Sequence, residues 1–266
     1  MTIVNLKKTT NQMIKEQKFK IIDSTNNEAQ RQLQTENPPK EDFVIRAEFQ
    51  TDGRGQRGNT WQAQNAANLT FSYVFFPLQM QVKNQFQISQ AAALSVVEFL
   101  KKNSIENVSI KWPNDIYVGM KKICGMLIEN SVSGHYIKSS IIGIGINVNQ
   151  SLFRENLPNP VSMTNITGKF YNLDEKFYEV VSILRQRLSL LKEGDFAALK
   201  EEYMSNLLGL NRTLIYSSSG TIFKGVIKDV DQRGYITIFN ENTLSESKYA
   251  FNEVNLIIPE QKKNVQ

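Results

Sequence analysis

The sequence predicts an α+β protein in which helices pack on a β-sheet and a small antiparallel β-barrel follows. Three observations support this fold class. Segments rich in β-branched and aromatic residues alternate with helical stretches in the first half of the chain. Two amphipathic helical stretches come next, and beyond Leu210 the chain changes to short alternating segments separated by turns. The 266 residues suffice for a large domain with a small companion.

The first half begins with a polar segment, residues 1–18, that shows no sustained helical stripe. A strand is predicted from Phe19, and the stretch Asp23-Ser24-Thr25-Asn26 then caps a polar helix. A helix over 88–102 carries its apolar residues near one face and should pack on the sheet. Further strands are predicted at 43–50, 69–76, 108–112, 115–118, 123–129 and 137–148. The segments 115–118 and 123–129 should pair across Gly119-Met120.

The second half begins with a loop over 149–168, marked by Pro158 and Pro160. Two amphipathic helices are predicted at 174–193 and 195–208, separated by Gly194. The last strands are predicted at 212–216, 221–230, 234–239 and 248–258. We therefore predict a large domain over 19–208 and a barrel over 211–260.

The composition excludes several classes of protein. The single cysteine, Cys124, rules out an internal disulfide framework, and the single histidine, His135, argues against a zinc site or a histidine triad. The net charge of +5 is spread along the chain without a nucleic-acid recognition motif, so no nucleic-acid partner is expected. We expect a cytoplasmic protein without a membrane partner, because no segment reaches the roughly 18 apolar residues of a membrane helix.

The glycine-rich stretch Thr51-Asp52-Gly53-Arg54-Gly55-Gln56-Arg57-Gly58-Asn59-Thr60-Trp61 is the most informative loop. Its GxGxxG pattern alone is weak, and a strand follows it where a dinucleotide-binding site would need a helix. Glycines let backbone amides approach an anion, and arginines suit phosphate and carboxylate oxygens. The stretch therefore fits a loop over an anionic ligand, although a hairpin loop with solvated charges remains an alternative.

Two further groups of residues carry potential chemistry. Lys111-Trp112-Pro113-Asn114-Asp115 and the lysine pair at 121–122 lie at strand ends, where a scaffold can direct a lysine into a cleft. A solvated lysine, or a simple ion pair of Asp115 with Lys111, is the alternative. Gly143 and Gly145 interrupt an apolar strand, which suggests close approach by a ligand or another segment.

Taken in order, these residues resemble the biotin protein ligases. The motifs Ser-Thr-Asn, Gln-Thr-x-Gly-Arg-Gly, Lys-Trp-Pro-Asn-Asp, Lys-Ile-x-Gly-x-Leu-x-Glu and Gly-x-Gly-x-Asn run from Ser24 to Asn147. The resemblance implies a mixed-sheet catalytic domain of the biotin/lipoate ligase type over 19–208 and an SH3-like barrel over 211–260. It also implies an ATP-dependent ligase that forms biotinyl-5'-AMP with magnesium and then biotinylates a lysine. Such chemistry needs positioning and charge neutralisation, not a protein nucleophile.

By this similarity, Lys122, Arg54 and Lys111 would be catalytic, and Asp115 would help to hold magnesium. Trp61 would stack on adenine. The residues implied for biotin are Ser24, Thr25, Asn26, Gln50, Gly53, Arg54, Gly55, Gln56, Lys122, Gly125, Gly143 and Gly145. Those implied for ATP or the adenylate are Arg54, Arg57, Trp61, Lys111, Asn114, Asp115 and Asn147. Many family members have arginine where this chain has Gln56, so retention of the adenylate is expected to rest partly on Arg57.

The resemblance implies a biotin carboxyl carrier protein or domain as partner. Our hypothesis for its docking is pairing between edge strands of the carrier and of the catalytic sheet. With only about eighteen residues before the first predicted strand, we expect no winged-helix domain and no operator binding. A monomer and a homodimer both remain open. The nearest alternative function is a lipoate or octanoate ligase or transferase, and the second is a non-enzymatic binding module.

Overall fold

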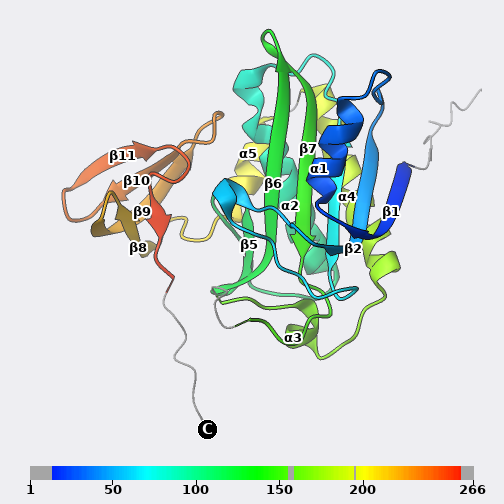
Figure 1. Cartoon of the computed structure of the whole chain (residues 1–266). Helices are drawn as coiled ribbons and strands as arrows, with labels where there is room; N and C mark the ends of the chain where they lie inside the picture. Colours follow the sequence, from blue (N-terminus) through cyan, green and yellow to red (C-terminus); the bar gives the residue numbers. More distant parts are fainter. Residues whose placement is uncertain (1–13, 155–158, 195, 259–266) are drawn as a thin grey trace, which may run out of the picture.

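The computed structural model describes residues 14–154, 159–194 and 196–258, and it contains two sheets (Figure 1). The larger sheet has the strand order β1-β2-β3-β7-β6-β5-β4. Its edge strand β1 runs parallel to β2, and its other neighbouring strands pair antiparallel. The strands are β1 (Lys15–Ile22), β2 (Phe43–Gln50), β3 (Leu69–Phe75), β4 (Val108–Lys111), β5 (Asp115–Val118), β6 (Lys121–Ser133) and β7 (Tyr136–Ile146).

Helices cover both faces of the large sheet. Figure 1 shows α1 on the near face, with α2, α4 and α5 behind the sheet. The α-helices are α1 (Thr25–Leu33), α2 (Phe86–Lys102), α3 (Met163–Thr167), α4 (Leu173–Glu193) and α5 (Ala197–Ser205). Short 3₁₀ helices lie at η1 (Gln56–Gly58) and η2 (Val82–Asn84). In the described part of the chain, we find no helix with the length and apolar character required to span a membrane.

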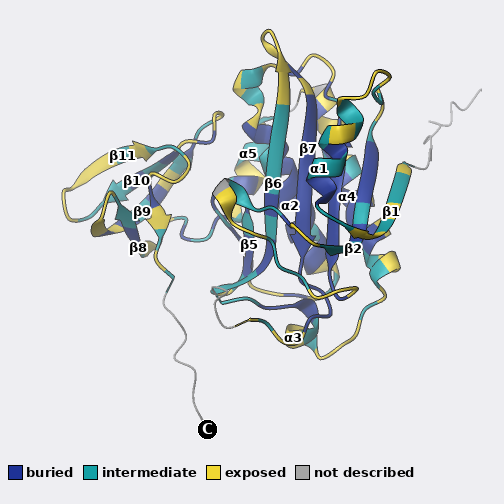
Figure 2. Ribbon diagram, in the orientation of Figure 1, coloured by how far each residue is buried: buried dark blue, intermediate teal, exposed yellow. Residues whose placement is uncertain are grey.

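The alternation of side chains along β2 explains why the sheet is covered twice. Phe43 and Ile45 pack with Ala29 of α1, whereas Val44 between them points into the larger core that contains α2. Both faces of the central strands are therefore buried, as the dark ribbons in Figure 2 show.

The C-terminal sheet has five antiparallel strands in the order β11-β10-β9-β8-β12. Its strands are β8 (Thr213–Ser218), β9 (Thr221–Val230), β10 (Ile236–Asn240), β11 (Ser245–Tyr249) and β12 (Asn255–Leu256). The predicted fold class is thus confirmed: helices pack on a mixed sheet, and a small antiparallel β-structure follows. The predicted hairpin across Gly119-Met120 is also present, as β5 and β6.

Several element boundaries differ from the prediction. The first strand begins at Lys15 and not at Phe19, because its polar residues pair with β2 at the sheet edge. The strand predicted over 248–258 is two strands, since the chain turns at Asn252, whose φ is +70°. Part of the predicted loop forms α3, which begins with a capping box between Ser162 and Asn165.

Candidate active site

One cavity collects side chains from distant parts of the chain. Its walls come from the start of α1, the β2–β3 loop, the β4–β5 turn, the first half of β6, the end of β7, and the C-terminal segment that begins at Asn252. The sheet brings these parts together: the Asn26 side chain, for example, reaches the Leu127 carbonyl, 101 residues away. A cavity in which polar groups from several elements converge is the default candidate for a binding site.

The start of α1 supplies three buried polar side chains, those of Ser24, Thr25 and Asn26. Ser24 has the extended backbone of an N-cap residue, and its hydroxyl oxygen accepts a hydrogen bond from the Asn27 N–H at 3.5 Å. The cap ends β1 and starts the helix within a few residues. The three side chains are therefore held at a fixed place above the sheet.

Two neighbouring side chains orient Thr25 and Asn26. Ser72 Oγ lies 2.6 Å from Asn26 Oδ1 and 2.8 Å from Thr25 Oγ1. Thr25 donates to Gln50 Oε1 from its backbone N–H at 2.7 Å and from its hydroxyl at 3.0 Å. Within the described ranges, the Ser24 hydroxyl proton and the Gln50 side-chain N–H groups donate to no other residue. These donors remain available to a ligand.

The floor of the cavity is made by glycines on β6 and β7. A Cβ atom on Gly143 would overlap the Asn26 amide, and one on Gly145 would overlap the Trp61 indole. Gly125 pairs with Gly145, and a Cβ there would lie 3.2 Å from the same indole. The glycines therefore let protein side chains approach the sheet closely. The sequence left open whether a ligand or another segment approaches these glycines, and in this structure the Asn26 and Trp61 side chains do so.

Two lysines in different surroundings face the cavity beyond this floor. Lys122 Nζ forms an ion pair with Asp115 Oδ1 at 2.7 Å, so the pair that the sequence left open for Asp115 is made with Lys122. Lys111 lies with its Nζ 5.9 Å from the centroid of the Tyr117 ring. Burial lowers the pKa of Lys111, the nearby Lys122 adds to this effect, and Asp115 opposes it. A bound anion would offset this desolvation.

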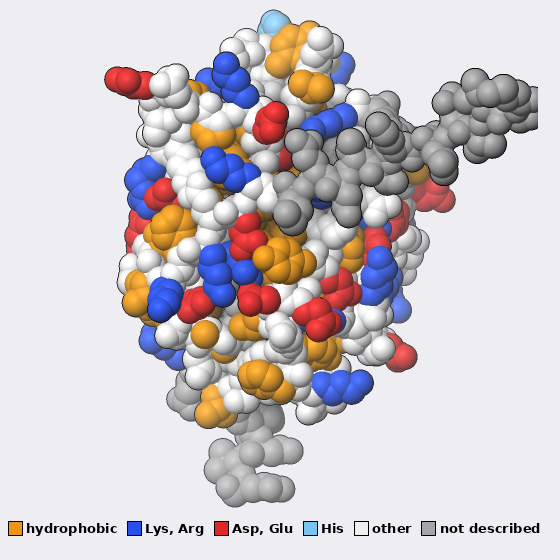
Figure 3. All heavy atoms as spheres, turned by 90° about the vertical axis from the view of Figure 1, so that its right-hand side faces the viewer, with side chains coloured by type: hydrophobic (Ala, Val, Ile, Leu, Met, Phe, Trp, Pro, Cys, Tyr) orange, Lys and Arg blue, Asp and Glu red, His pale blue; other side chains and the backbone are white. Residues whose placement is uncertain are grey.

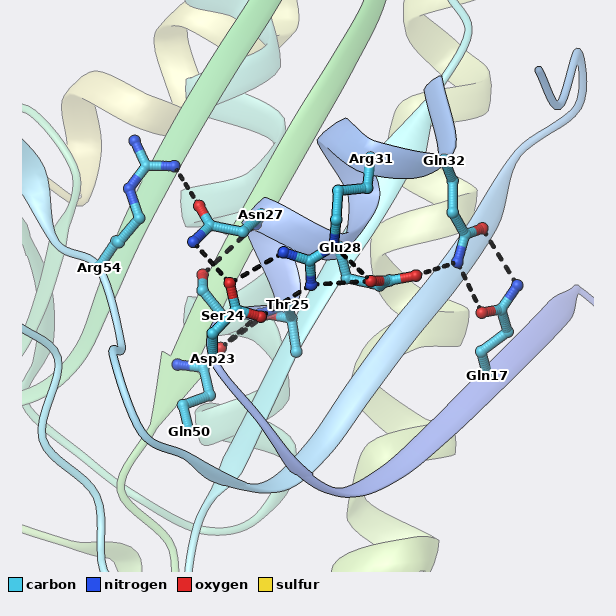
Figure 4. Close-up of polar contacts among 10 residues, drawn as sticks. All are labelled: Gln17, Asp23, Ser24, Thr25, Asn27, Glu28, Arg31, Gln32, Gln50 and Arg54. Atoms are coloured by element: carbon cyan, nitrogen blue, oxygen red, sulfur yellow. Dashed lines mark hydrogen bonds and ion pairs between the residues drawn. The ribbon is translucent and has the colours of Figure 1, made fainter. Parts of the chain in front are cut away.

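The loop of residues 51–61 lies over the start of α1. The Arg54 guanidinium donates to Glu129 Oε1 at 2.8 Å and to Asn27 Oδ1 at 2.9 Å, and Figure 4 shows the second contact. The loop closes on itself where the Gly55 N–H donates to the Asn59 carbonyl at 2.7 Å. Arg57 belongs to η1, but its side chain lies outside the described part of the structure.

The C-terminal sheet contacts the β4–β5 turn. Trp112 Nε1 donates to the Gly234 carbonyl at 3.0 Å, and the Trp112 ring packs edge-on against Phe251, with centroids 5.3 Å apart. Phe251 also packs against Phe86 of α2. Asn252, Val254, Asn255 and Leu256 follow Phe251 and line the cavity. This sheet therefore forms a wall beside Lys111 and Asp115.

Most residues that the sequence assigned to the site meet at this cavity. Gly53 lies at the base of the loop, outside the lining, and Asn147 is buried with its amide donating to the Val161 carbonyl at 3.1 Å. The assigned residues that line the cavity are Ser24, Thr25, Asn26, Gln50, Arg54, Gly55, Gln56, Trp61, Lys111, Asn114, Asp115, Lys122, Gly125, Gly143 and Gly145.

Three residues of the network were not assigned from the sequence. Glu129 is the last residue of the Lys-Ile-x-Gly-x-Leu-x-Glu motif, and Asn27 directly follows Ser-Thr-Asn, so these motifs could have pointed to both residues. Ser72 lies near no motif, and a serine inside an apolar strand forms no distinctive sequence pattern. Only the packing of β3 under α1 reveals its contacts.

The chain is similar in sequence to several known proteins. Residues 18–147 match the model of the Biotin/lipoate A/B protein ligase family. The bifunctional ligase/repressor BirA of Bacillus spizizenii is 27% identical over 221 residues, which cover 82% of this chain and 67% of that protein. The biotin–[acetyl-CoA-carboxylase] ligase of Paracoccus denitrificans is 26% identical over 200 residues, which cover 73% of this chain and 82% of the relative.

The solved structures agree with these relatives. The biotin protein ligase of Aquifex aeolicus, in complex with biotin and ATP, superposes with a TM-score of 0.76 at 28% identity. The match covers 92% of this chain and 99% of the Aquifex chain. The chain is similar to biotin protein ligases over most of its length. The Aquifex match extends well past residue 147, so the family likeness is not confined to the part that the family model recognises.

Proposed function

We propose that this chain is an ATP-dependent biotin protein ligase. It would activate biotin as biotinyl-5'-AMP with release of pyrophosphate and then transfer the biotinyl group to a lysine of a biotin carboxyl carrier protein or domain. The observation that carries the proposal is the meeting of Arg54, Lys111 and Lys122 at one cavity that also holds the buried polar start of α1. The names of the relatives support biotin as the acid.

The start of α1 is suited to the ureido ring of biotin, which has N–H donors and a carbonyl acceptor. The Ser24 hydroxyl and the Gln50 amide are the groups that would donate to the ureido oxygen. Asn26 has its amide engaged by Ser72 and Glu129, so its part in binding would be to shape the pocket. The acid would extend from this end toward the lysines.

The lysines are suited to the charge that develops during activation. A biotin carboxylate oxygen attacks the α-phosphorus of ATP, the bond to the bridging oxygen breaks, and pyrophosphate leaves. Lys122 would contact the carboxylate, and Lys111 would face the phosphates. The neutral carrier amine then attacks the carbonyl carbon, the bond to the phosphate oxygen breaks and AMP leaves as the anion. The amine nitrogen loses one proton to water as the amide forms. Positioning would supply most of the rate, since no protein nucleophile is needed.

Magnesium would enter with the nucleotide. Asp115 is the one carboxylate among the described residues that line the cavity. The described chain holds no group of three or more acidic, histidine or cysteine side chains that could bind a metal. Mg²⁺ usually takes one or two carboxylates and completes its shell with substrate phosphates and water. Asp115 fits that limited role, and the ion supplies neutralisation of phosphate charge when bound.

The open edge of β6 is suited to the carrier. In the described strands, β5 pairs with β6 only as far as Gly125, and residues 127–133 of β6 pair with β7 alone. The two outer edges of the large sheet, formed by β4 and β1, are less open to a carrier strand. Residues 206–208 bond to Ile110 along β4, and β1 carries three lysines, on a side where Figure 3 shows acidic and basic side chains mixed. We place the carrier strand along β6, beside Glu129 and the loop.

The deciding experiment incubates the chain with biotin, MgATP and a carrier domain, and measures both pyrophosphate release and the mass of the carrier. A carrier heavier by one biotinyl group is the expected product. Lipoate or octanoate in place of biotin tests the nearest alternative: a carrier modified by these acids, with none of the biotinyl product, would make the chain a lipoate or octanoate ligase. If no pyrophosphate is released with any of these acids, the result would favour the non-enzymatic binding module.

A further inference from the structure

The C-terminal sheet lies beside β5 and β6 (Figure 1), and its β9–β10 turn, residues 231–235, carries an arginine toward the open edge of β6. We propose that Arg233 in this turn binds an acidic side chain of the carrier, next to the carrier strand that lies along β6. The inference rests on the proposed function, because it takes the carrier as the docking partner. It adds the residue through which the C-terminal sheet selects a carrier.

Hydrogen bonds within the β9–β10 turn fix its shape. Asp231 Oδ1 accepts from the backbone N–H of Arg233 at 2.9 Å and from that of Tyr235 at 3.0 Å. The Gly234 N–H donates to the Asp231 carbonyl at 2.9 Å, and the Asp231 N–H donates to the Tyr235 carbonyl at 2.9 Å. An aspartate that accepts from backbone groups ahead of it stabilises such a turn. The backbone of Arg233 is therefore held in one conformation.

The residue after Arg233 fastens the turn to the rest of the molecule. The Gly234 carbonyl accepts from Trp112 Nε1 at 3.0 Å. Gly234 has a φ of +89°, and a Cβ atom on it would lie 2.7 Å from the Phe86 ring and 2.9 Å from the Phe251 ring. Both the backbone conformation and the close packing call for glycine here. Arg233 thus keeps a set position relative to the large sheet.

Arg233 has no ion pair in the described structure. Asp231, the nearest acid along the chain, is engaged: its Oδ2 pairs with Lys248 Nζ at 2.6 Å, and its Oδ1 accepts from the turn's own backbone. Among the described residues that line the small cavity at this turn, Arg233 is the one charged side chain. An exposed guanidinium without a counter-charge is suited to a carboxylate, which it can bind with two parallel hydrogen bonds.

The small cavity beside Arg233 adjoins the open edge of β6. Ile128 and Asn130 line it, and both lie in the stretch of β6 that pairs with β7 alone. Alternate residues of a strand share a face, so these two side chains point to the same side of the sheet. Carrier residues paired opposite them project from that same face. An acid at one of these carrier positions therefore faces Arg233.

The place of Arg233 favours a carrier acid over the phosphates of ATP. Pro113 and Asn114 line both the small cavity and the active-site cavity, so a carrier held at the first lies next to the second. Lys111 lines the active-site cavity, whereas Arg233 does not. We therefore assign the phosphates to Lys111 and the carrier carboxylate to Arg233.

Steady-state biotinylation at varied concentrations of an isolated apo carrier domain tests the inference. Arg233→Glu should raise the KM for the carrier about tenfold and Arg233→Ala about threefold. The kcat should change by no more than about twofold, because the contact is with the carrier and not with the reacting atoms. The effect of Arg233→Glu should shrink as salt is added, since the pair lies near the surface. A wild-type carrier KM in both variants would overturn the inference.

Lys228→Glu is the matched control, because it makes the same change of two charges within the C-terminal sheet. Lys228 is exposed on β9, lies 5.5 Å from the centroid of the Phe239 ring and lines neither cavity. Its carrier KM should stay within about twofold of wild type. An increase equal to that of Arg233→Glu would reduce the effect to net charge and overturn the specific contact.

Biotin-dependent exchange of pyrophosphate into ATP, measured without carrier, separates the two anions. The KM for ATP should stay within about twofold of wild type in both Arg233 variants. An increase in the ATP KM with an unchanged carrier KM would assign Arg233 to the phosphates and overturn the inference. If Arg233→Glu does not fold, as judged by loss of its unfolding transition, Arg233→Ala decides alone.

Charge reversal on the carrier identifies the acid. Each carrier Asp or Glu is changed singly to Lys and assayed with wild type and with Arg233→Glu. One carrier variant should be a poor substrate for wild type and recover with Arg233→Glu, as expected for two residues in contact. Recovery with none of them would rule out the ion pair. A wild-type chain that releases no pyrophosphate with biotin refutes the proposed function, whereas normal biotinylation with unaltered Arg233 variants refutes this inference alone.

Discussion

The buried Lys111 side chain lowers the stability of the folded chain, and the same burial suits it to bind a phosphate. In the described structure it has no ion pair with an acid, unlike Lys122, which is paired with Asp115. Burial lowers the pKa of Lys111, which means that the folded chain disfavours its charged form. An incoming phosphate would supply the missing counter-charge.

Lys111→Met should stabilise the chain and abolish pyrophosphate exchange. A lowered folded pKa destabilises the folded chain fully below that pKa, and the destabilisation disappears as the pH rises toward the unfolded value of 10.5. The variant should therefore unfold at a higher temperature at neutral pH, with the difference shrinking in alkaline buffer, while activity falls at least about a hundredfold. Thermal melts over pH and an exchange assay check both. A lower melting temperature at neutral pH would refute this account of Lys111.

Gln56 gives a second prediction about a single residue. Glutamine keeps hydrogen-bond donors but lacks the charge that arginine would bring to the adenylate. If retention rests partly on Arg57, Arg57→Ala should release biotinyl-5'-AMP severalfold faster. The check is the rate at which the adenylate appears in solution when no carrier is present. Wild type under the same conditions is the control. An equal rate of biotinyl-5'-AMP release from the two proteins would show that Arg57 does not help to retain the adenylate.

The paired strands β6 and β7 place glycines where other elements must approach. Gly145 accommodates the Trp61 indole, and Gly143 accommodates the Asn26 amide. Neither glycine has a positive φ, so alanine would fit the backbone of the strand and only its methyl group would conflict. Alanine substitutions can therefore test the roles of Gly143 and Gly145 separately.

Gly145→Ala should push Trp61 off the sheet and weaken biotin binding about tenfold or more. Tryptophan emission is expected to shift to the red as the indole enters water, against the background of Trp112, which is buried and packs against Phe251. Gly143→Ala is the matched comparison, because its methyl group meets Asn26 and should leave the emission unchanged. Unshifted emission from Gly145→Ala would show that Trp61 does not rest on the floor in solution.

At the scale of the whole molecule, the two sheets share the larger of the two buried clusters. Tyr216, Phe223 and Ile238 of the C-terminal sheet belong to the same buried cluster as α2. Lys200 of α5 and Asp229 of β9 add an ion pair at 2.8 Å. A shared core couples the stability of its parts. The predicted division into domains over 19–208 and 211–260 stays a prediction, which the unfolding behaviour of the chain can test.

We expect a single cooperative unfolding transition in calorimetry. Trp112→Phe, which removes the hydrogen bond to Gly234, should lower that transition by about 2–4 °C, since the bond contributes about 1 kcal/mol. The variant should keep one transition, because Phe251 still packs on the ring. Separate melting of the C-terminal sheet in the wild type would contradict the shared core and support two independent domains.

The sequence by itself determined the elements and the motifs that the site uses. Period-two and helical patterns, the capping stretch at residues 23–26 and the glycine-rich loop are local properties, so they could be predicted without the fold. Boundaries at weak signals, such as Lys15 and Asn252, could not, because pairing with a neighbour strand decides them.

Only the tertiary structure decided which polar groups meet. It paired Asp115 with Lys122, brought Glu129 to both Asn26 and Arg54, and laid Trp61 on Gly145. Each of these contacts depends on strand order and register, which bring together residues far apart in the chain. No periodicity within one segment carries that information, because a hydrogen bond is fixed by distance in space and not by separation in sequence.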